Sequence, residues 1–142
     1  MNEYRIFTDS ACDISAELLR FWGVKFCSLN FAFDGENRVY GNHELPAPVF
    51  YQFMRDGKIA RTSAVNPDTF AQAFEKELKK GRDILYIGVS SPLSATYNSA
   101  CIAAEELMEQ YPDRKILTVD SLGASAGMGM MVHLAVQQKK AG

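Results

Sequence analysis

The chain has 142 residues and a mass of 15.8 kDa, and 47% of its residues are hydrophobic against 23% charged. These values are typical of one globular domain and argue against a disordered chain or a coiled coil. Fifteen Lys and Arg against seventeen Asp and Glu leave a formal charge of −2, which argues against nucleic-acid binding and against a basic membrane-surface helix.

The cysteines indicate a reducing compartment. Cys12, Cys27 and Cys101 are odd in number and show no CxxC or CxxxxH spacing, so we expect free thiols, no metal site and a cytoplasmic protein. The N-terminal sequence MNEYRIFTDS lacks the basic and apolar regions of a signal peptide. No apolar run approaches the roughly 18 residues that a membrane-spanning helix needs, so we expect no transmembrane segment.

In the first half of the chain, short strand patterns alternate with short helix patterns. Residues 25–33 alternate with period two, which places their apolar side chains on one face of a single strand. The Asp34-Gly35 pair that follows is a strong hairpin signal. The predicted elements are a strand at Tyr4–Thr8, a helix from Ser15 to Gly23, a strand at Lys25–Phe33, a return strand at Arg38–Tyr40 and a helix at Val49–Arg55.

The second half has longer patterns. Asn66-Pro67-Asp68 is a helix start, with an N-cap, a proline in the first turn and an acid beside it. The run Asp83–Val89 is almost continuously apolar, as expected for a central strand. The predicted elements are a helix to about Lys80, that strand, a helix over residues 94–110, a strand at Lys115–Val119 and a helix from about Leu122 to Lys140. Strands separated by helices predict an α/β fold with a doubly wound, mostly parallel sheet flanked by helices.

Four loops rich in Ser and Thr lie where a ligand would bind to such a sheet, beyond the carboxyl ends of its strands. Free N–H groups at helix N-termini, together with hydroxyl side chains, make an anion site. The same residue types are also the preferred N-caps, and capping alone would explain any single loop. The loops are Thr8–Asp13, Arg61–Pro67, Ser90–Ala100 and Asp120–Gly127.

Two aspartates at strand ends offer an alternative interpretation as an enzyme. Asp9 and Asp120 each end a predicted strand and could act as general acid and base on a small phosphorylated or carboxylated metabolite. More often such aspartates accept hydrogen bonds from nearby loop N–H groups. The chain has no GxGxxG after its first strand and no P-loop motif. The glycine-rich stretch around Gly127 and Gly129 favours close helix packing.

Four motifs in order resemble DegV-family proteins. They are TDSACDISAELL, RTSAVNPDTF, VSSPLSATYNSACIAAEEL and VDSLGASAGMGMMV, and the resemblance extends from Arg5 to about Ala135. It implies the α/β fold of the DegV N-terminal domain, a long-chain fatty acid as ligand, no cofactor and no catalysis by this chain. It also implies a partner, the ATP-binding subunit of a bacterial fatty acid kinase, to which the protein presents the fatty-acid carboxylate for phosphorylation.

The resemblance implies that two hydroxyl side chains hold that carboxylate. They are Thr62, in the TS motif, and Ser94, in the sequence LSAT that corresponds to the family's LSGT. A carboxylate there would receive charge-assisted hydrogen bonds from hydroxyl and backbone N–H groups. Each buried CH₂ group of an acyl chain contributes about 0.8 kcal/mol, which favours a buried tunnel. Secondary candidates on the same loops are Ser63, Ser10, Ser91, Thr96, Asp9 and Ser121.

The chain departs from the family pattern in its motifs and in its length. Ala64 and Val65 replace the usual Gln and Pro, and Ala95 replaces Gly, while both hydroxyl positions remain. The proteins that the chain resembles are longer and have a second domain. We therefore expect residues 1–142 to be the N-terminal domain, as a fragment or a truncated product. That second domain supplies a histidine and an arginine near the headgroup, and neither His43 nor His133 is expected to replace them. A truncated chain with impaired binding is the remaining alternative.

Overall fold

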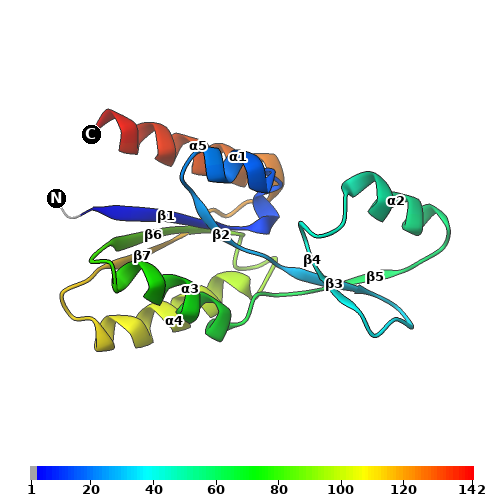
Figure 1. Ribbon diagram of the computed structural model, residues 1–142, viewed down its shortest axis with the longest axis horizontal. Helices are drawn as coiled ribbons and strands as arrows, with labels where there is room; N and C mark the ends of the chain where they lie inside the picture. Colours follow the sequence, from blue (N-terminus) through cyan, green and yellow to red (C-terminus); the bar gives the residue numbers. More distant parts are fainter. Residues whose placement is uncertain (1–2) are drawn as a thin grey trace.

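The computed structural model describes residues 3–142 and contains a four-stranded parallel sheet with the strand order β2-β1-β6-β7. Two helices cover each face of this sheet, α1 and α5 on one side and α3 and α4 on the other (Figure 1). The strands are β1 (Tyr4–Asp9), β2 (Lys25–Cys27), β6 (Asp83–Gly88) and β7 (Ile116–Asp120). The helices are α1 (Ala16–Phe21), α3 (Pro67–Leu78), α4 (Thr96–Gln110) and α5 (Ser125–Ala141), with a short 3-10 helix, η1, at Ser10–Cys12. The predicted doubly wound α/β fold is confirmed.

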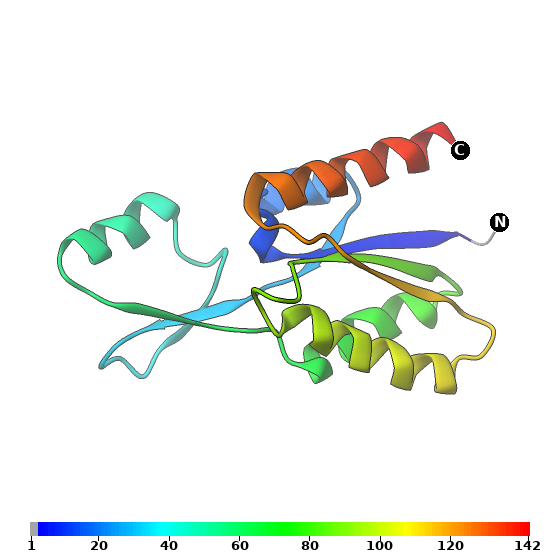
Figure 2. The ribbon, with the colours of Figure 1, turned by 180° about the vertical axis from the view of Figure 1, so that it is seen from behind.

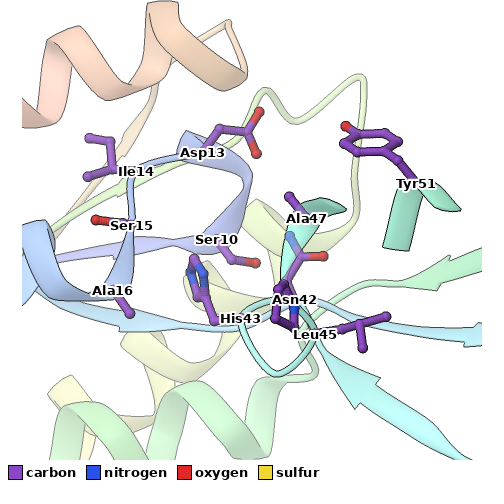
Figure 3. Close-up of a pocket in the computed structure, with 11 residues that line it drawn as sticks. Ser10, Asp13, Ile14, Ser15, Ala16, Asn42, His43, Leu45, Ala47 and Tyr51 are labelled. Atoms are coloured by element: carbon purple, nitrogen blue, oxygen red, sulfur yellow. The ribbon is translucent and has the colours of Figure 1, made fainter. Parts of the chain in front are cut away.

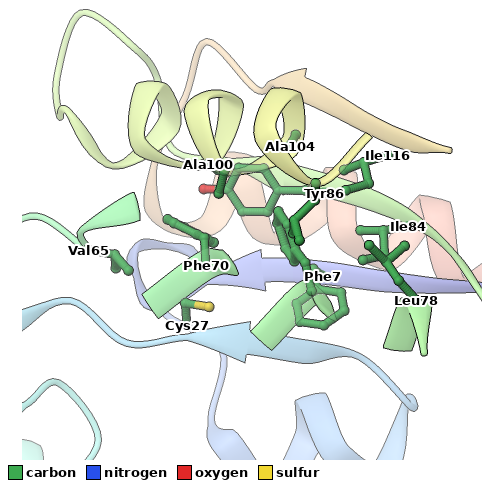
Figure 4. Close-up of a cluster of buried hydrophobic side chains, with 13 residues drawn as sticks. Phe7, Cys27, Val65, Phe70, Leu78, Ile84, Tyr86, Ala100, Ala104 and Ile116 are labelled. Atoms are coloured by element: carbon green, nitrogen blue, oxygen red, sulfur yellow. The ribbon is translucent and has the colours of Figure 1, made fainter. Parts of the chain in front are cut away.

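Alternate residues of the central strands enter separate hydrophobic cores on the two faces. On β1, Phe7 joins the core beneath α3 and α4, while its neighbour Ile6 joins the core beneath α1 and α5. In the first core, the rings of Phe70 and Tyr86 are completely buried (Figure 4). The ring of Phe74 is completely buried as well. This double burial explains why the central strands read as nearly continuous apolar runs.

A second, antiparallel sheet forms a lobe that projects beyond the parallel sheet (Figure 2). We call this part, residues 30–63, the lobe. Its strand order is β4-β3-β5. Its elements are β3 (Asn30–Phe33), β4 (Val39–Gly41), α2 (Ala47–Arg55) and β5 (Ala60–Ser63). Two rings of β3 pack on α2. The ring centroids of Phe31 and Phe50 are 5.0 Å apart, and those of Phe33 and Phe53 are 5.5 Å apart. An aromatic cluster therefore holds the lobe together.

The prediction of one strand over Lys25–Phe33 was wrong. The chain pairs with β1 as far as Cys27 and then crosses into the lobe, where β3 pairs with β4 and β5. The backbone N–H of Leu29 donates to the Ser10 hydroxyl at 2.9 Å, at the crossing. Both strands are extended, so the period of two continues through the crossing and hides the change of sheet.

The prediction of a loop over Arg61–Pro67 was also partly wrong, because β5 occupies its first residues. The strand is short and polar, and its Arg61, Thr62 and Ser63 are exposed, so it lacks the apolar alternation that marks a strand in sequence. Pairing with β3 forms this strand. The structure places Thr62 opposite Phe31 in the lobe sheet.

The glycine-rich start of α5 packs closely, as predicted, at one of its two glycines. A Cβ on Gly129 would lie 3.1 Å from the carbonyl oxygen of Cys12, whereas one on Gly127 would meet nothing within 4 Å. Met128 beside them is completely buried. Within residues 3–142, none of the helices combines the length and the apolar character that crossing a bilayer requires.

Candidate functional site

The carboxyl ends of the parallel strands face the lobe (Figure 1), and the loops there are joined by backbone hydrogen bonds. The N–H of Ser90, after β6, donates to the carbonyl of Gly123 at 2.9 Å, and the N–H of Ser121, after β7, donates to the carbonyl of Gly88 at 3.1 Å. The loops that carry Ser91 and Ser121 are therefore brought together, as their positions after neighbouring strands predict.

Thr96 connects the segment between β5 and α3 to the loop after β6. Its side chain is completely buried, and its Oγ1 accepts hydrogen bonds from the backbone N–H of Val65 at 3.2 Å and from the Ser94 hydroxyl at 2.9 Å. The N–H of Thr96 donates in turn to Ser94 Oγ at 3.2 Å. Val65 lies three residues after Thr62 in the sequence, so this network brings the two predicted carboxylate-binding segments to one corner of the molecule.

The two predicted carboxylate ligands differ in their surroundings. Thr62 is exposed on β5 at the end of the lobe sheet, and its neighbour Ser63 is exposed opposite Asn30. Ser94 is half-buried and precedes α4. The first-turn N–H groups of a helix have no partner within the helix and can bind an anion, although the N–H of Thr96 already donates to Ser94 Oγ. The segments that carry Thr62 and Ser94 thus meet near the N-terminus of the 15-residue helix α4, where the Ser94 hydroxyl donates to Thr96 in this structure.

The two aspartates hold loops. Burial raises the pKa of Asp9 above its ordinary value, against the opposing effect of hydrogen bonds from Tyr86, Val89 and Ala11. Asp120 accepts hydrogen bonds from the backbone N–H groups of Ser91 at 3.3 Å and Leu122 at 3.0 Å. The Ser91 side chain and these N–H groups lower the pKa of Asp120. Both carboxylates accept from loop N–H groups, as such strand-end aspartates usually do.

Comparison with known proteins assigns the chain to a family. A protein-family model described as "Uncharacterised protein, DegV family" matches residues 3–142. The chain belongs to the DegV family. A DegV domain-containing protein of Clostridium perfringens (strain 13 / Type A) is 41% identical over 143 residues, which cover 100% of this chain and 49% of the relative. The chain spans about half the length of the curated relatives it matches.

Two solved structures share the fold of this DegV chain. A stearic-acid-binding protein from Eubacterium ventriosum has a TM-score of 0.90 at 28% identity, with 98% of this chain and 48% of that one covered. A DegV-family protein from Thermus thermophilus, described by its fatty acid binding, has a TM-score of 0.85 at 31% identity, with coverages of 99% and 48%. The fold that the motifs imply is therefore confirmed.

The remaining predicted residues of the DegV motifs serve the loops in which they lie. Ser10 Oγ accepts from the Leu29 N–H, and Ser121 Oγ donates to the Gly123 carbonyl at 3.1 Å while accepting from the Gly123 N–H. Thr96 is buried behind Ser94, so it can act on a ligand through Ser94. Within residues 3–142, no three His, Cys, Asp or Glu side chains gather as a metal site would require.

A cleft of about 630 Å³ separates η1 and α1 from the lobe (Figure 3). Ser10 lines this cleft, whereas Thr62 and Ser94 do not. Apart from Asp13, which lies in the predicted loop Thr8–Asp13, sequence reasoning missed its other polar lining, because no motif links the segment after β1 to residues of the lobe. Besides Ser10, the polar lining residues include Asp13, Ser15, Asn42, His43 and Tyr51.

His43 is a structural residue at the edge of this cleft. Its ring meets Phe26 edge-on with centroids 4.9 Å apart. Burial and the charge of Arg20 lower the pKa of His43, although the charge of Asp13 opposes the shift. His133 lies against Trp22, with centroids 4.9 Å apart.

Proposed function

We propose that the chain binds a long-chain fatty acid and holds its carboxylate at the corner formed by Thr62, Ser94 and the N-terminus of α4. The observation that carries this proposal is the hydrogen-bond network of Thr96, which joins the segments bearing the two hydroxyls. Hydroxyl and backbone N–H donors form short, strong hydrogen bonds to an ionised carboxylate. The similar proteins from Eubacterium ventriosum and Thermus thermophilus are described as fatty-acid-binding, which supports the same ligand class here.

We further propose that the protein is a carrier without catalysis of its own. It would present the carboxylate to the ATP-binding subunit of a fatty acid kinase, which performs the phosphoryl transfer, and it would need no cofactor. The two aspartates support a carrier, because an acid–base pair needs carboxyl groups free to exchange protons with a ligand, whereas both accept loop N–H groups. The free thiols of Cys12, Cys27 and Cys101 support a cytoplasmic location.

The test is to measure bound lipid and its affinity. Native mass spectrometry of the purified protein should show a co-purified fatty acid, and a fluorescent fatty acid should bind to the delipidated protein. Each charge-assisted hydrogen bond is worth about 1.5–3 kcal/mol, so Ser94→Ala and Thr62→Val should each raise the Kd by roughly 10- to 150-fold. The matched controls Ser99→Ala, on α4, and Thr69→Val, on α3, should bind like the unsubstituted protein.

The outcomes separate ligand from site. Absence of co-purified fatty acid together with absence of binding to the delipidated protein would refute the proposed function. Fatty-acid binding that survives both Ser94→Ala and Thr62→Val unchanged would refute the placement of the carboxylate at these residues, while leaving the ligand class in place.

A further inference from the structure

A buried carboxylate on the neighbouring strand holds the start of the loop that carries Ser94. Asp9 ends β1 and is completely buried. Its Oδ2 accepts hydrogen bonds from the Tyr86 hydroxyl at 2.7 Å and from the Val89 N–H at 3.0 Å, and its Oδ1 accepts from the Ala11 N–H at 3.0 Å. One carboxylate therefore joins η1, the side of β6 and the first residue after β6.

We propose that Asp9 is a positioning residue for the carboxylate site, holding the loop from Val89 to Ser94 in its binding geometry. This inference rests on the proposed function, because it assigns a role to Asp9 in the same site. Asp9 does not touch the ligand: it is buried and each of its oxygens already accepts from a protein donor. It acts on Ser94 through the backbone.

The backbone path from Asp9 to Ser94 is short. Val89 N–H is held by Asp9, and the next residue, Ser90, is buried and donates to the Gly123 carbonyl. The carbonyl of Ser90 then accepts from the N–H groups of Leu93 at 2.9 Å and Ser94 at 3.2 Å. Because Ser94 is hydrogen-bonded to the carbonyl of Ser90, which follows Val89 directly, a displacement of Val89 also displaces the backbone and hydroxyl of Ser94.

Tyr86 anchors the carboxylate to the rigid part of the fold. Its ring is buried in the core beneath α3 and α4 (Figure 4), with its centroid 5.1 Å from that of Phe70 and 6.3 Å from that of Tyr97. The side chain of Asp9 thus fixes the loop relative to packed aromatic rings. Side chains locked by packing in this way are what preorganises a binding site.

Asp9→Asn tests the proposal because it keeps the shape and removes one acceptor. The amide has a single oxygen, so its NH₂ group must face either the Ala11 N–H or the Tyr86 and Val89 donors on the other side, and at least one donor contact becomes repulsive. Asp83→Asn is the matched control. Asp83 is the first residue of β6, at the end of the strand opposite Val89, and its Oδ1 accepts from the Lys115 N–H at 3.0 Å.

The first measurement is hydrogen exchange in the ligand-free protein, which does not depend on the ligand. In Asp9→Asn, exchange over residues 89–94 should rise by about tenfold, because the neutral amide offers the Val89 N–H, in either orientation, a weaker acceptor than a carboxylate or no acceptor. In Asp83→Asn, exchange over the same residues should equal that of the unsubstituted protein. Equal exchange over residues 89–94 in both variants would overturn the proposal.

The second measurement compares a fatty acid with the alcohol of the same chain length. Asp9→Asn should weaken binding of the acid by about tenfold and that of the alcohol far less, because the carboxylate depends most on aligned donors. A loss of the same factor for both ligands would show a merely structural role and would overturn the proposal. If the unsubstituted protein binds neither ligand, the proposed function fails, and Asp9 has no binding site to position.

Tyr86→Phe carries the test if Asp9→Asn does not fold. It removes one donor to Asp9 and leaves the ring packing and the Val89 contact in place. Exchange over residues 89–94 should rise by less than tenfold, because Asp9 keeps its hydrogen bond from Val89 but loses the donor that fixes its own position. The ratio of acid to alcohol affinity should fall. Unchanged exchange together with an unchanged ratio would overturn the proposal.

Discussion

The buried hydroxyl of Thr96 should stabilise the junction between the lobe and the parallel sheet, and Thr96→Val tests this. Valine has nearly the same shape but cannot accept the Val65 N–H, which donates to Oγ1 at 3.2 Å. Thr96 is completely buried and Val65 is 4% exposed, so water cannot replace the lost acceptor. An unsatisfied buried N–H costs about 1–3 kcal/mol, which for a domain of this size lowers the Tm by roughly 3–10 °C.

Urea unfolding followed by circular dichroism measures this cost, with Thr118→Val as the control. The Thr118 hydroxyl on β7 accepts only long hydrogen bonds, from the Tyr97 hydroxyl at 3.4 Å and from the Cys101 thiol at 3.6 Å, so its loss should change the free energy of unfolding by less than about 0.5 kcal/mol. Thr96→Val should also weaken fatty-acid binding, because Ser94 loses the partner that orients its hydroxyl. Equal stability of the two variants would refute the assignment of the junction to Thr96.

Two further predictions concern the parallel-sheet domain. Although burial opposes ionisation, hydrogen bonds and charges from basic neighbours lower the pKa of Glu77 to about 2, so ionised Glu77 contributes about 3 kcal/mol above pH ~4.5 that is lost as the pH falls towards 2. Urea unfolding of Glu77→Gln should therefore show a deficit at pH 7 that narrows at pH 3, and an equal deficit at both would contradict this. In Gly129→Ala, the new Cβ would meet the Cys12 carbonyl oxygen at 3.1 Å, whereas Gly127→Ala gains helix propensity without a contact. Gly129→Ala should therefore be less stable than Gly127→Ala by about 1–2 kcal/mol. Equal melting temperatures of the two variants would contradict the close packing at Gly129.

The parallel part of the fold follows from local patterns. The run DILYIGV has too few polar residues for a strand with a solvent-facing side, and β6 is indeed covered on both faces. The helix start at Asn66 is equally local: its side chain accepts from the Thr69 N–H at 2.8 Å, as the N-cap pattern predicts. Such signals depend on neighbours along the chain, which a single sequence displays.

The lobe was not predictable in the same way, because its sheet is formed by partners distant in sequence. Nothing local distinguishes Cys27, the last residue paired with β1, from Phe31 in the next sheet, since both are buried apolar residues in one alternating pattern. The strand β5 exists through pairing with β3 some 30 residues earlier. The same limit applies to the site: the contact between Asp9 and Tyr86 joins residues 77 positions apart.

Two hydroxyls of the hydroxyl-rich loops accept hydrogen bonds where the chain crosses between the two sheets. The chain passes between the two sheets twice, from β2 to β3 and from β5 to α3, and at each crossing a backbone N–H of the chain donates to a hydroxyl of the parallel-sheet domain. Ser10 accepts from Leu29 at the first crossing and Thr96 accepts from Val65 at the second. These two hydroxyls attach the segments that enter and leave the lobe to the loops of the parallel sheet. Because Thr62 is carried by the lobe and Ser94 by the parallel-sheet domain, the distance between the two proposed carboxylate ligands depends on residues that need never touch the carboxylate.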